Sequence, residues 1–315
     1  MILVCGEALI DLFVDRPAEG GLPTEAVAGG SPFNVAIALA RLERETAFLS
    51  TISDDVFGRF LVSRLSEAGV SQAYLRRCPL RTTLSVVATD PNGHPSYSFY
   101  AEAGADRALT PGDVPSTLPD GINAIAAGSY ALGVEPVASA IETLLARESA
   151  RRVVSLDPNV RPRVVGDVAA FRARFERLLA HAGVVKASVE DVEAFYGSAE
   201  LDSVALDWLR RGPKLVVFTR GADGTVAFSG AASVERPAPK VDVVDTVGAG
   251  DTFHAALLAA LDAAGLLTVD SPALRETELV RALNYAAAAA ALVCTRRGAD
   301  PPTHAEVARF MNAGV

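Results

Sequence analysis

The segment spanning residues 243–253, Val-Val-Asp-Thr-Val-Gly-Ala-Gly-Asp-Thr-Phe, constrains the fold of this chain more than any other stretch. It predicts a strand over residues 240–244, a turn of small residues at 248–250, and a long apolar helix over 252–264. Small residues leave the backbone N–H groups of such a turn open to a ligand. The start of a helix adds unpaired N–H donors and a partial positive charge. The segment therefore predicts an anion site, most naturally one for a phosphate.

Asp251 lies in the same turn and suggests chemistry as well as binding. A phosphate bound there would repel a carboxylate, so an acidic residue is unexpected unless it acts on the ligand. Such a carboxylate can take the proton of a hydroxyl group that attacks the phosphorus. The alternative is an ordinary aspartate that caps a buried helix. The segment alone does not decide between these two roles.

Composition limits the class of protein and its partners. The chain has 315 residues, half of them hydrophobic, which suffices for one large core, and its net charge of −9 argues against a nucleic acid as partner. Cys5, Cys78 and Cys294 lack the spacing of metal ligands and indicate free thiols in a reducing compartment. The apolar run at 286–293 is too short to span a bilayer. We therefore expect a cytoplasmic protein that binds neither nucleic acid nor membrane.

Apolar runs alternate with helical patterns from residue 123 onward, which predicts a doubly wound, mostly parallel α/β sheet covered by helices. Strands are expected at 2–5, 47–51, 122–126, 152–156, 183–186 and 214–219, with a last helix at 278–294. Ligands of such sheets bind at the carboxyl ends of the strands. One cleft should therefore collect the polar residues that follow these runs: Asp11, Asp157, Asn159, Arg161, Lys186, Thr219, Gly221 and Asp251.

Several of these candidates have structural alternatives. Asp11 can bind a pair of sugar hydroxyls, or it can serve as a turn residue. Gly29 and Gly30 permit close backbone approach, and Asn34 is expected to open a helix, where it can be a simple N-cap. Arg161 can offer its planar fork to phosphate or sugar oxygens, or it can form a surface salt bridge.

Two strand-rich pieces interrupt the α/β pattern. Residues 82–89 and 96–101 alternate in polarity around the turn signal Asp90-Pro91-Asn92-Gly93, and residues 11–27 are similarly short of helix. They predict a small inserted β-sheet, in which Phe99 can stack on a ligand or fill the interior. The division that we expect assigns residues 1–10, 35–80 and 106–315 to the α/β body and residues 11–34 and 81–105 to the inserted sheet.

Two segments resemble the signatures of the PfkB (ribokinase-like) carbohydrate kinases. Residues 28–36, Ala-Gly-Gly-Ser-Pro-Phe-Asn-Val-Ala, are similar to the N-terminal signature, and residues 245–253 are similar to the C-terminal one. The resemblance implies that Gly248, Ala249 and Gly250 form an anion hole for the transferring phosphate and that Asp251 is the catalytic base. It also implies that the inserted sheet is a lid over the sugar and the interface of a homodimer.

The same resemblance implies an acceptor site, a nucleotide site and cation sites. Ser188 and Asp191 align with an Asn-x-x-Glu motif that orders Mg²⁺ through water, with Glu190 as an alternative ligand. Asp245 and Val247 resemble a site for a monovalent cation such as K⁺. The acceptor sugar is expected at Asp11, Gly29, Gly30, Asn34, Phe99, Asp157, Asn159 and Arg161. ATP is expected at Lys186, Ser188, Thr219, Gly221, Gly224, Val247 and Ala287, the last where many relatives have an asparagine facing the adenine.

Competing functions fit the sequence less well. A dinucleotide-binding dehydrogenase would need a third glycine where Phe253 stands, and the P-loop string is absent. Residues 4–11, 155–161 and 185–188 look most like the bacterial fructokinase branch, which implies the conversion of ATP and D-fructose to D-fructose 6-phosphate. The acceptors 2-keto-3-deoxygluconate, ribose and a nucleoside remain open. So does a non-catalytic sugar-binding regulator, although such a protein would be expected to lose the base or the anion hole.

Overall fold

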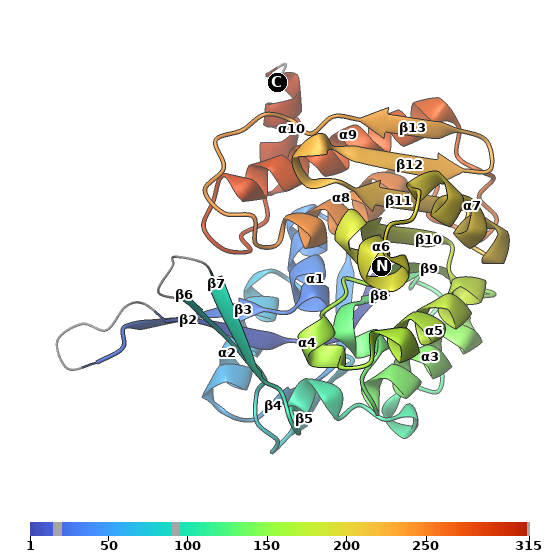
Figure 1. Cartoon of the computed structure of the whole chain (residues 1–315). Coiled ribbons are helices and arrows are strands. Elements are labelled where there is room, and N and C mark those ends of the chain that lie inside the picture. The colour runs from blue at the N-terminus through green and yellow to red at the C-terminus, as the bar shows by residue number, and fades with distance from the viewer. Residues whose placement is uncertain (15–20, 90–94, 314–315) are drawn as a thin grey trace.

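A computed structural model describes residues 1–14, 21–89 and 95–313 (Figure 1). Its centre is a nine-stranded sheet in the order β13-β12-β11-β10-β9-β8-β1-β4-β5. All neighbours from β11 to β5 pair in parallel, whereas β12 and β13 run antiparallel. The strands are β1 (Ile2–Cys5), β4 (Thr46–Ser53), β5 (Leu75–Cys78), β8 (Ala124–Gly128), β9 (Val153–Asp157), β10 (Val184–Ser188), β11 (Leu215–Thr219), β12 (Thr225–Ser229) and β13 (Ser233–Arg236). The predicted doubly wound, mostly parallel sheet is confirmed.

Successive residues of the central strands enter two different cores, so both faces of the sheet are covered. Ile2 and Val4 of β1 belong to one hydrophobic cluster, and Leu3 and Cys5 belong to the other. This explains why these strands are continuously apolar in sequence. The first face is covered by helices α1 (Ser31–Arg41), α2 (Val56–Glu67), α8 (Ala249–Ala263), α9 (Glu276–Cys294) and α10 (His304–Asn312). The second face is covered by helices α3 (Val137–Glu148), α5 (Val168–Leu178), α6 (Val189–Tyr196) and α7 (Leu201–Arg211). Helix α4 (Pro162–Val165) is a single short turn.

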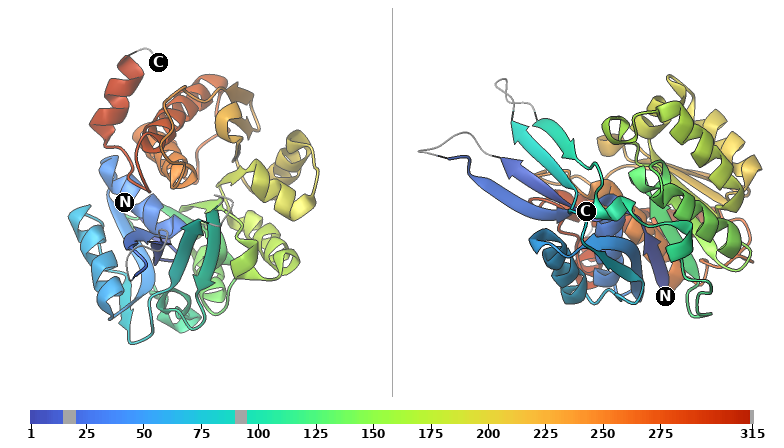
Figure 2. Two further views of the ribbon diagram at one scale, coloured as in Figure 1. Left: turned by 60° about the vertical axis from the view of Figure 1, so that its left-hand side comes forward. Right: turned by 90° about the horizontal axis from the view of Figure 1, so that it is seen from below.

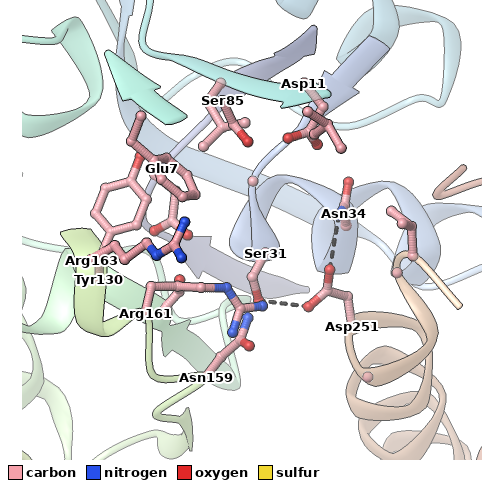
Figure 3. A pocket seen from close by; sticks show the side chains of 18 of the residues that line it. Glu7, Asp11, Ser31, Asn34, Ser85, Tyr130, Asn159, Arg161, Arg163 and Asp251 are labelled. Carbon is pink, nitrogen blue, oxygen red and sulfur yellow. Dashed lines mark hydrogen bonds between the residues drawn. The ribbon is translucent and has the colours of Figure 1, made fainter. Parts of the chain in front are cut away.

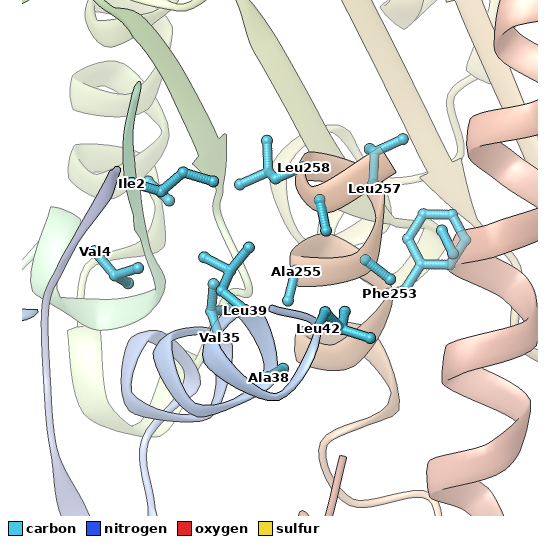
Figure 4. Close-up of a cluster of buried hydrophobic side chains, with 14 of the residues drawn as sticks. Ile2, Val4, Val35, Ala38, Leu39, Leu42, Phe253, Ala255, Leu257 and Leu258 are labelled. Atoms are coloured by element: carbon cyan, nitrogen blue, oxygen red, sulfur yellow. The ribbon is translucent and has the colours of Figure 1, made fainter. Parts of the chain in front are cut away.

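Helices α1 and α8 pack directly against each other on the first face (Figure 4). Leu39 of α1 and Leu42 directly after it are buried, as are Phe253 and Leu257 of α8. Alanines on both helices, such as Ala38 and Ala255, let the backbones approach closely. The packing therefore fixes the start of α1 relative to the start of α8, although these segments lie at opposite ends of the sequence.

A second, small sheet in the order β3-β2-β6-β7 projects from this body (Figure 2). It consists of β2 (Leu9–Val14), β3 (Thr24–Gly29), β6 (Leu84–Thr89) and β7 (Pro95–Tyr100). The predicted pairing of the last two strands is confirmed, since Leu84 lies opposite Tyr100 in antiparallel register. The turn predicted at Asp90–Gly93 lies outside the described residues. The small sheet begins at Leu9 rather than at residue 11, and residues 31–34 belong to α1.

Four details of the predicted helices and strands are wrong. Residues 240–244 form no strand, because Pro237 and Pro239 interrupt the chain after β13 and leave Val243 and Val244 exposed. Helix α8 begins at Ala249 rather than at residue 252, and α1 begins three residues before Asn34. The helix over 276–294 is not the last, because α10 follows with a capping box between Thr303 and Glu306.

The described part of the chain contains no helix that is both long and apolar enough to cross a membrane. The alanine run of α9 instead lies in the core next to α8, where Ala286 and Ala289 are fully buried. Cys5, Cys78 and Cys294 are free thiols, as predicted.

The α1–α8 contact predicts a measurable loss of stability when it is weakened. Leu39→Ala removes a fully buried side chain and should lower the free energy of unfolding by about 2–5 kcal/mol, as measured by urea denaturation. Leu206→Ala is the matched control, because Leu206 lies exposed on α7, and it should change stability by less than about 0.5 kcal/mol. Equal losses in the two variants would show that the contact contributes little.

Candidate active site

A cavity of about 630 Å³ lies between the small sheet and the carboxyl ends of the central strands (Figure 3). Strand β1 lies between β4 and β8, so the strand order reverses there and leaves the crevice in which such sheets bind ligands. The residues after β1, β8 and β9 line one side, the small sheet covers the cavity, and α8 begins at the opposite side. The polar lining residues are Glu7, Asp11, Ser31, Asn34, Ser85, Ser129, Tyr130, Asn159, Arg161, Arg163, Thr246 and Asp251.

Asp251 is held by two side chains from the start of α1. Ser31 Oγ donates to Asp251 Oδ1 at 2.6 Å, and Asn34 Nδ2 donates to Oδ2 at 2.8 Å. Figure 3 shows both hydrogen bonds and the carboxylate facing the cavity. Asn34 therefore does not cap α1 but orients the carboxylate of a distant helix. Asp251 caps no helix with its side chain either, which leaves it available for chemistry.

The first turn of α8 presents backbone N–H groups to the same space. Gly248 caps the helix in the left-handed conformation (φ 76°), where a Cβ atom would also clash with Ala299 at 2.7 Å. Within the described part of the chain, the N–H groups of Gly250 and Asp251 donate to no protein acceptor. They are the unpaired donors that a helix start offers to an anion.

The glycine pair before α1 is required by close backbone approach. A Cβ atom on Gly29 would lie 2.2 Å from Asp11 Oδ2. Gly30 adopts φ 103°, and a Cβ atom there would lie 2.8 Å from the carbonyl oxygen of Glu7. The pair therefore lets the β3–α1 turn lie directly against β2 and the end of β1. Asp11 lies on β2 at the cavity wall, and its pKa is raised because burial outweighs the hydrogen bond from Ser85.

A buried ion pair lies beneath the start of α8. Lys186 Nζ donates to Asp157 Oδ2 at 2.9 Å, and both side chains are nearly inaccessible. The lysine Nζ lies 3.2 Å from the position of a Cβ atom on Gly250. Burial raises the pKa of Asp157 to about 6, opposed by Lys186, so the carboxylate stays ionised at neutral pH. The positive charge of Lys186 therefore adds to that of the helix start.

His254 completes this buried group. It shares a 2.7 Å hydrogen bond with Ser155 Oγ through Nε2, and its Nδ1 lies 4.0 Å from Asp157 Oδ2. Burial, together with the charge of Lys186, lowers the pKa of His254 to about 3, so the ring is neutral. The group thus contains one cation, Lys186, and one anion, Asp157, and His254 adds no charge.

The expected convergence of eight polar residues on one cleft is only partly observed. Asp11, Asn159, Arg161 and Asp251 line the cavity, whereas Asp157 and Lys186 are buried behind it, where they form an ion pair. The other predicted residues found in the lining are Gly30, Asn34, Phe99, Val247, Gly248 and Gly250. Those outside the lining are Gly29, Ser188, Glu190, Asp191, Thr219, Gly221, Gly224, Asp245, Ala249 and Ala287.

The residues predicted for Mg²⁺ hold different positions. Asp191 forms a capping box with Ser188, and its other oxygen accepts the N–H of Val160 at 2.6 Å. Its oxygens are therefore engaged with donors, whereas Glu190 in the same turn is exposed. No cluster of three acidic, histidine or cysteine ligands occurs among the described residues. An exposed carboxylate still fits Mg²⁺, because this ion retains waters and needs few protein ligands.

Asp245 stabilises the loop that leads into α8 by two hydrogen bonds. Its carboxylate accepts the N–H of Val247 at 3.0 Å and that of Gly298 at 2.8 Å. These hydrogen bonds connect the loop after α9 to the turn that precedes α8. Ala287 is buried in the core between α8 and α9, away from the cavity.

Sequence reasoning missed several residues of the cavity. Glu7 lies two residues after the end of β1 and is about 1% exposed, and burial raises its pKa to about 8. Tyr130 and the buried Asp106 lie next to it, joined by a 2.7 Å hydrogen bond from the phenol. Ser31 was part of the glycine-rich signature, and Glu7 was a carboxylate immediately after an apolar run. Both residues stand in segments that the sequence singles out, but no spacing to other polar residues marks either of them as part of the cavity.

A covered cavity in an α/β body, with a carboxylate facing it from the start of a helix, is the arrangement expected of a carbohydrate kinase. The chain belongs to the pfkB family of carbohydrate kinases, whose family model matches residues 1–306. It is 42% identical to a fructokinase of Rhizobium leguminosarum bv. trifolii over 268 residues, which are 85% of this chain and 82% of that protein. It is 36% identical to a fructokinase of Salmonella typhimurium over 310 residues, 95% and 94% of the two chains.

Solved structures agree with this family. A fructokinase from Xylella fastidiosa with bound ATP superposes with a TM-score of 0.89 at 29% identity, over 99% of this chain and 98% of that one. A Vibrio cholerae fructokinase in a fructose-, ADP- and calcium-bound form gives a TM-score of 0.82 at 28% identity, over 98% of both chains. The resemblance drawn from the two signatures is confirmed.

The buried ion pair predicts an asymmetry between single and double substitutions. Lys186→Met leaves Asp157 buried without its partner and should cost about 3–5 kcal/mol of unfolding free energy in urea denaturation at pH 7. Adding Asp157→Leu removes the stranded carboxylate, so the double variant should be more stable than the single one. Lys240→Met, at an exposed position, is the control. A double variant less stable than Lys186→Met would contradict this account.

Proposed function

We propose that this chain is an ATP-dependent fructokinase that transfers the γ-phosphate of ATP to the 6-hydroxyl of D-fructose. The observation that carries the proposal is the Asp251 carboxylate, aimed by Ser31 and Asn34 into a covered cavity at the start of α8. The fructokinases among its relatives and structural neighbours support fructose as the acceptor.

The acceptor sugar is bound on the side of the small sheet. Asp11, Gly30, Asn34 and Arg161 offer acceptors and donors for its hydroxyls, with Phe99 against its apolar face. Asn159 contributes a further amide, whereas Asp157 and Gly29 act indirectly by supporting the wall. Asp251 accepts the proton of the 6-hydroxyl as its oxygen attacks the phosphorus. The covering sheet excludes water, which would otherwise compete as the phosphate acceptor.

The transferring phosphate is bound at the start of α8. The N–H groups of Gly250 and Asp251 stabilise the charge that develops on its oxygens, reinforced by the buried Lys186, whereas the N–H group of Ala249 already donates to the carbonyl oxygen of Thr246. The nucleotide extends past β10 and β11 toward Ser188, Thr219, Gly221, Gly224 and Ala287. Mg²⁺, when bound with ATP, neutralises charge on the phosphate oxygens, and Glu190 is the best-placed residue to hold one of its waters. Asp245 and Val247 are the proposed K⁺ site.

The proposed assembly is a cytoplasmic homodimer formed through the small sheet. Tyr100 at the end of β7 is exposed, as is Leu22 before β3, and both could be covered by a partner. The assignment of this sheet as a separate lid domain is part of the same proposal.

One observation favours a second acceptor class. Arg161 and Arg163 both line the cavity, and two guanidinium groups suit a carboxylate as well as a phosphate. An acidic sugar such as 2-keto-3-deoxygluconate is therefore the main competitor of fructose.

An acceptor panel tests the proposed reaction. ATP consumption should be fastest, by kcat/KM, with D-fructose in a set of neutral sugars, sugar acids and nucleosides, with Mg²⁺ and with or without K⁺. Preference for a sugar acid would retain the kinase and replace the acceptor. An absence of turnover with every acceptor would favour a non-catalytic sugar-binding protein.

The role of Asp251 has its own test. Asp251→Asn keeps the size of the side chain but removes the base, so turnover should fall about 100-fold or more while the far-ultraviolet circular dichroism stays unchanged. Asp242→Asn is the control. It makes the same chemical change at an exposed position seven residues before the start of α8 at Ala249 and should leave turnover unaltered. Near-normal turnover of Asp251→Asn would remove this residue from the mechanism.

A further inference from the structure

Glu7 is a buried carboxyl group in the cavity wall for which the proposed mechanism has no use. It follows β1 at the point where the strand order reverses, and Gly6 before it lies against Pro32 at the start of α1, since a Cβ on Gly6 would be 2.4 Å from Pro32 Cγ. Among the described residues, Glu7 Oε2 has no hydrogen-bond partner. A buried polar atom without a partner in the wall of a ligand cavity points to a group on the ligand.

The surroundings of Glu7 favour its neutral form. The negative charges of Asp106 and Asp251 disfavour its ionisation, and the hydrogen bond from Ser129, which lowers the pKa of Glu7, only partly opposes the effect of burial. Tyr130 lies beside it, and its hydroxyl donates to Asp106 rather than to Glu7. The arginines of the cavity, Arg161 and Arg163, are the cations of this wall, and Asp11 faces it from the small sheet. Burial is the largest effect, and it raises the pKa of Glu7 to about 8.

We propose that Glu7 is a specificity-determining residue that, as a protonated carboxylic acid, hydrogen-bonds a hydroxyl group of an uncharged acceptor sugar. A neutral carboxyl group offers one O–H donor and retains acceptor capacity, which matches the dual character of a sugar hydroxyl. A carboxylate at the same position could only accept, and it would lie close to Asp106 and Asp251. This inference rests on the proposed kinase function and assigns the chemistry of its acceptor at the end of the cavity near β1.

Two substitutions separate the hydrogen bond from the shape of the side chain. Glu7→Gln keeps a neutral donor and acceptor, so KM for the acceptor should stay within about threefold. Glu7→Met has similar bulk but cannot form the bond, so KM for the acceptor should rise about 10- to 100-fold while KM for ATP is unchanged. An unchanged acceptor KM in a folded Glu7→Met variant would overturn the proposal.

The pH dependence of the acceptor reaction gives a readout that a structural role would not change. In the unmodified chain, kcat/KM for the acceptor should fall above about pH 8 as Glu7 ionises. The fall should be absent in Glu7→Gln and in the less active Glu7→Met, because neither side chain has a proton to lose. Glu102→Gln, at an exposed position, is the control and should show the fall of the unmodified chain. Identical profiles for Glu7→Gln and the unmodified chain would contradict the protonated state.

Protein stability tests the same proton without any acceptor. The pKa of Glu7 is about 8 in the folded chain and 4.5 for an ordinary glutamate, so the folded state binds the proton more tightly. Its contribution is therefore favourable below pH 4.5 and is lost as the pH rises through 8. The melting temperature of Glu7→Gln relative to the unmodified chain should rise from pH 5 to pH 8.

The two kinds of measurement distinguish the possible failures. If the stability difference is pH-dependent but no neutral sugar is phosphorylated, the fructokinase proposal fails and the proton on Glu7 is supported. If fructose is phosphorylated but Glu7→Gln follows the unmodified chain in both pH experiments, the assignment of Glu7 fails and the fructokinase proposal stands.

Discussion

The contact between α1 and α8 is the interaction on which the site depends. It joins residues 31–41 to residues 249–263 through a shared apolar interface, and its two helix starts meet at the cavity. Only this packing allows Ser31 and Asn34 to reach the carboxylate of Asp251. The cost of burying a carboxylate is offset here by two directed hydrogen bonds, which also limit its rotation. A stable core and an oriented base are thus products of one helix–helix contact.

The start of α8 must meet two opposite requirements for charge. A phosphate site must be positive, yet a base for an attacking hydroxyl must be negative, and the proposed mechanism places both within one turn of α8. The chain supplies the positive field from backbone N–H groups and from Lys186, which is buried and neutralised on its far side by Asp157. No cationic side chain then needs to stand between Asp251 and the phosphate, where it would pair with the base. This arrangement also explains how an acidic chain can bind a polyanionic nucleotide.

Local sequence predicted those parts of the molecule that depend on short-range rules. The apolar runs predicted the parallel strands, and the two glycine-rich segments predicted the turn at the start of α8 and pointed to Asp251 and Asn34, which the structure brings together. The false strand at 240–244 and the late start of α8 arose because the pattern is apolar there, whereas two prolines and Gly248 decide the backbone. The buried pair of Lys186 and Asp157 was assigned to ligands because each follows an apolar strand. That they satisfy each other depends on the spacing of neighbouring strands, which a single sequence does not display.

The two ends of the cavity carry different chemical groups, because different elements of the fold supply them. The end of β1 contributes a buried carboxyl group, while the start of α8 lies across the cavity with its N–H donors and Asp251 (Figure 3). An acceptor sugar must therefore place its reacting hydroxyl toward α8 and its remaining hydroxyls toward β1 and the small sheet. In the proposed reaction, residues near β1 determine which acceptor is bound, whereas those at α8 determine how phosphate is transferred. Acceptor preference can change in such a site without loss of the chemistry, because the two functions lie on separate elements of the fold.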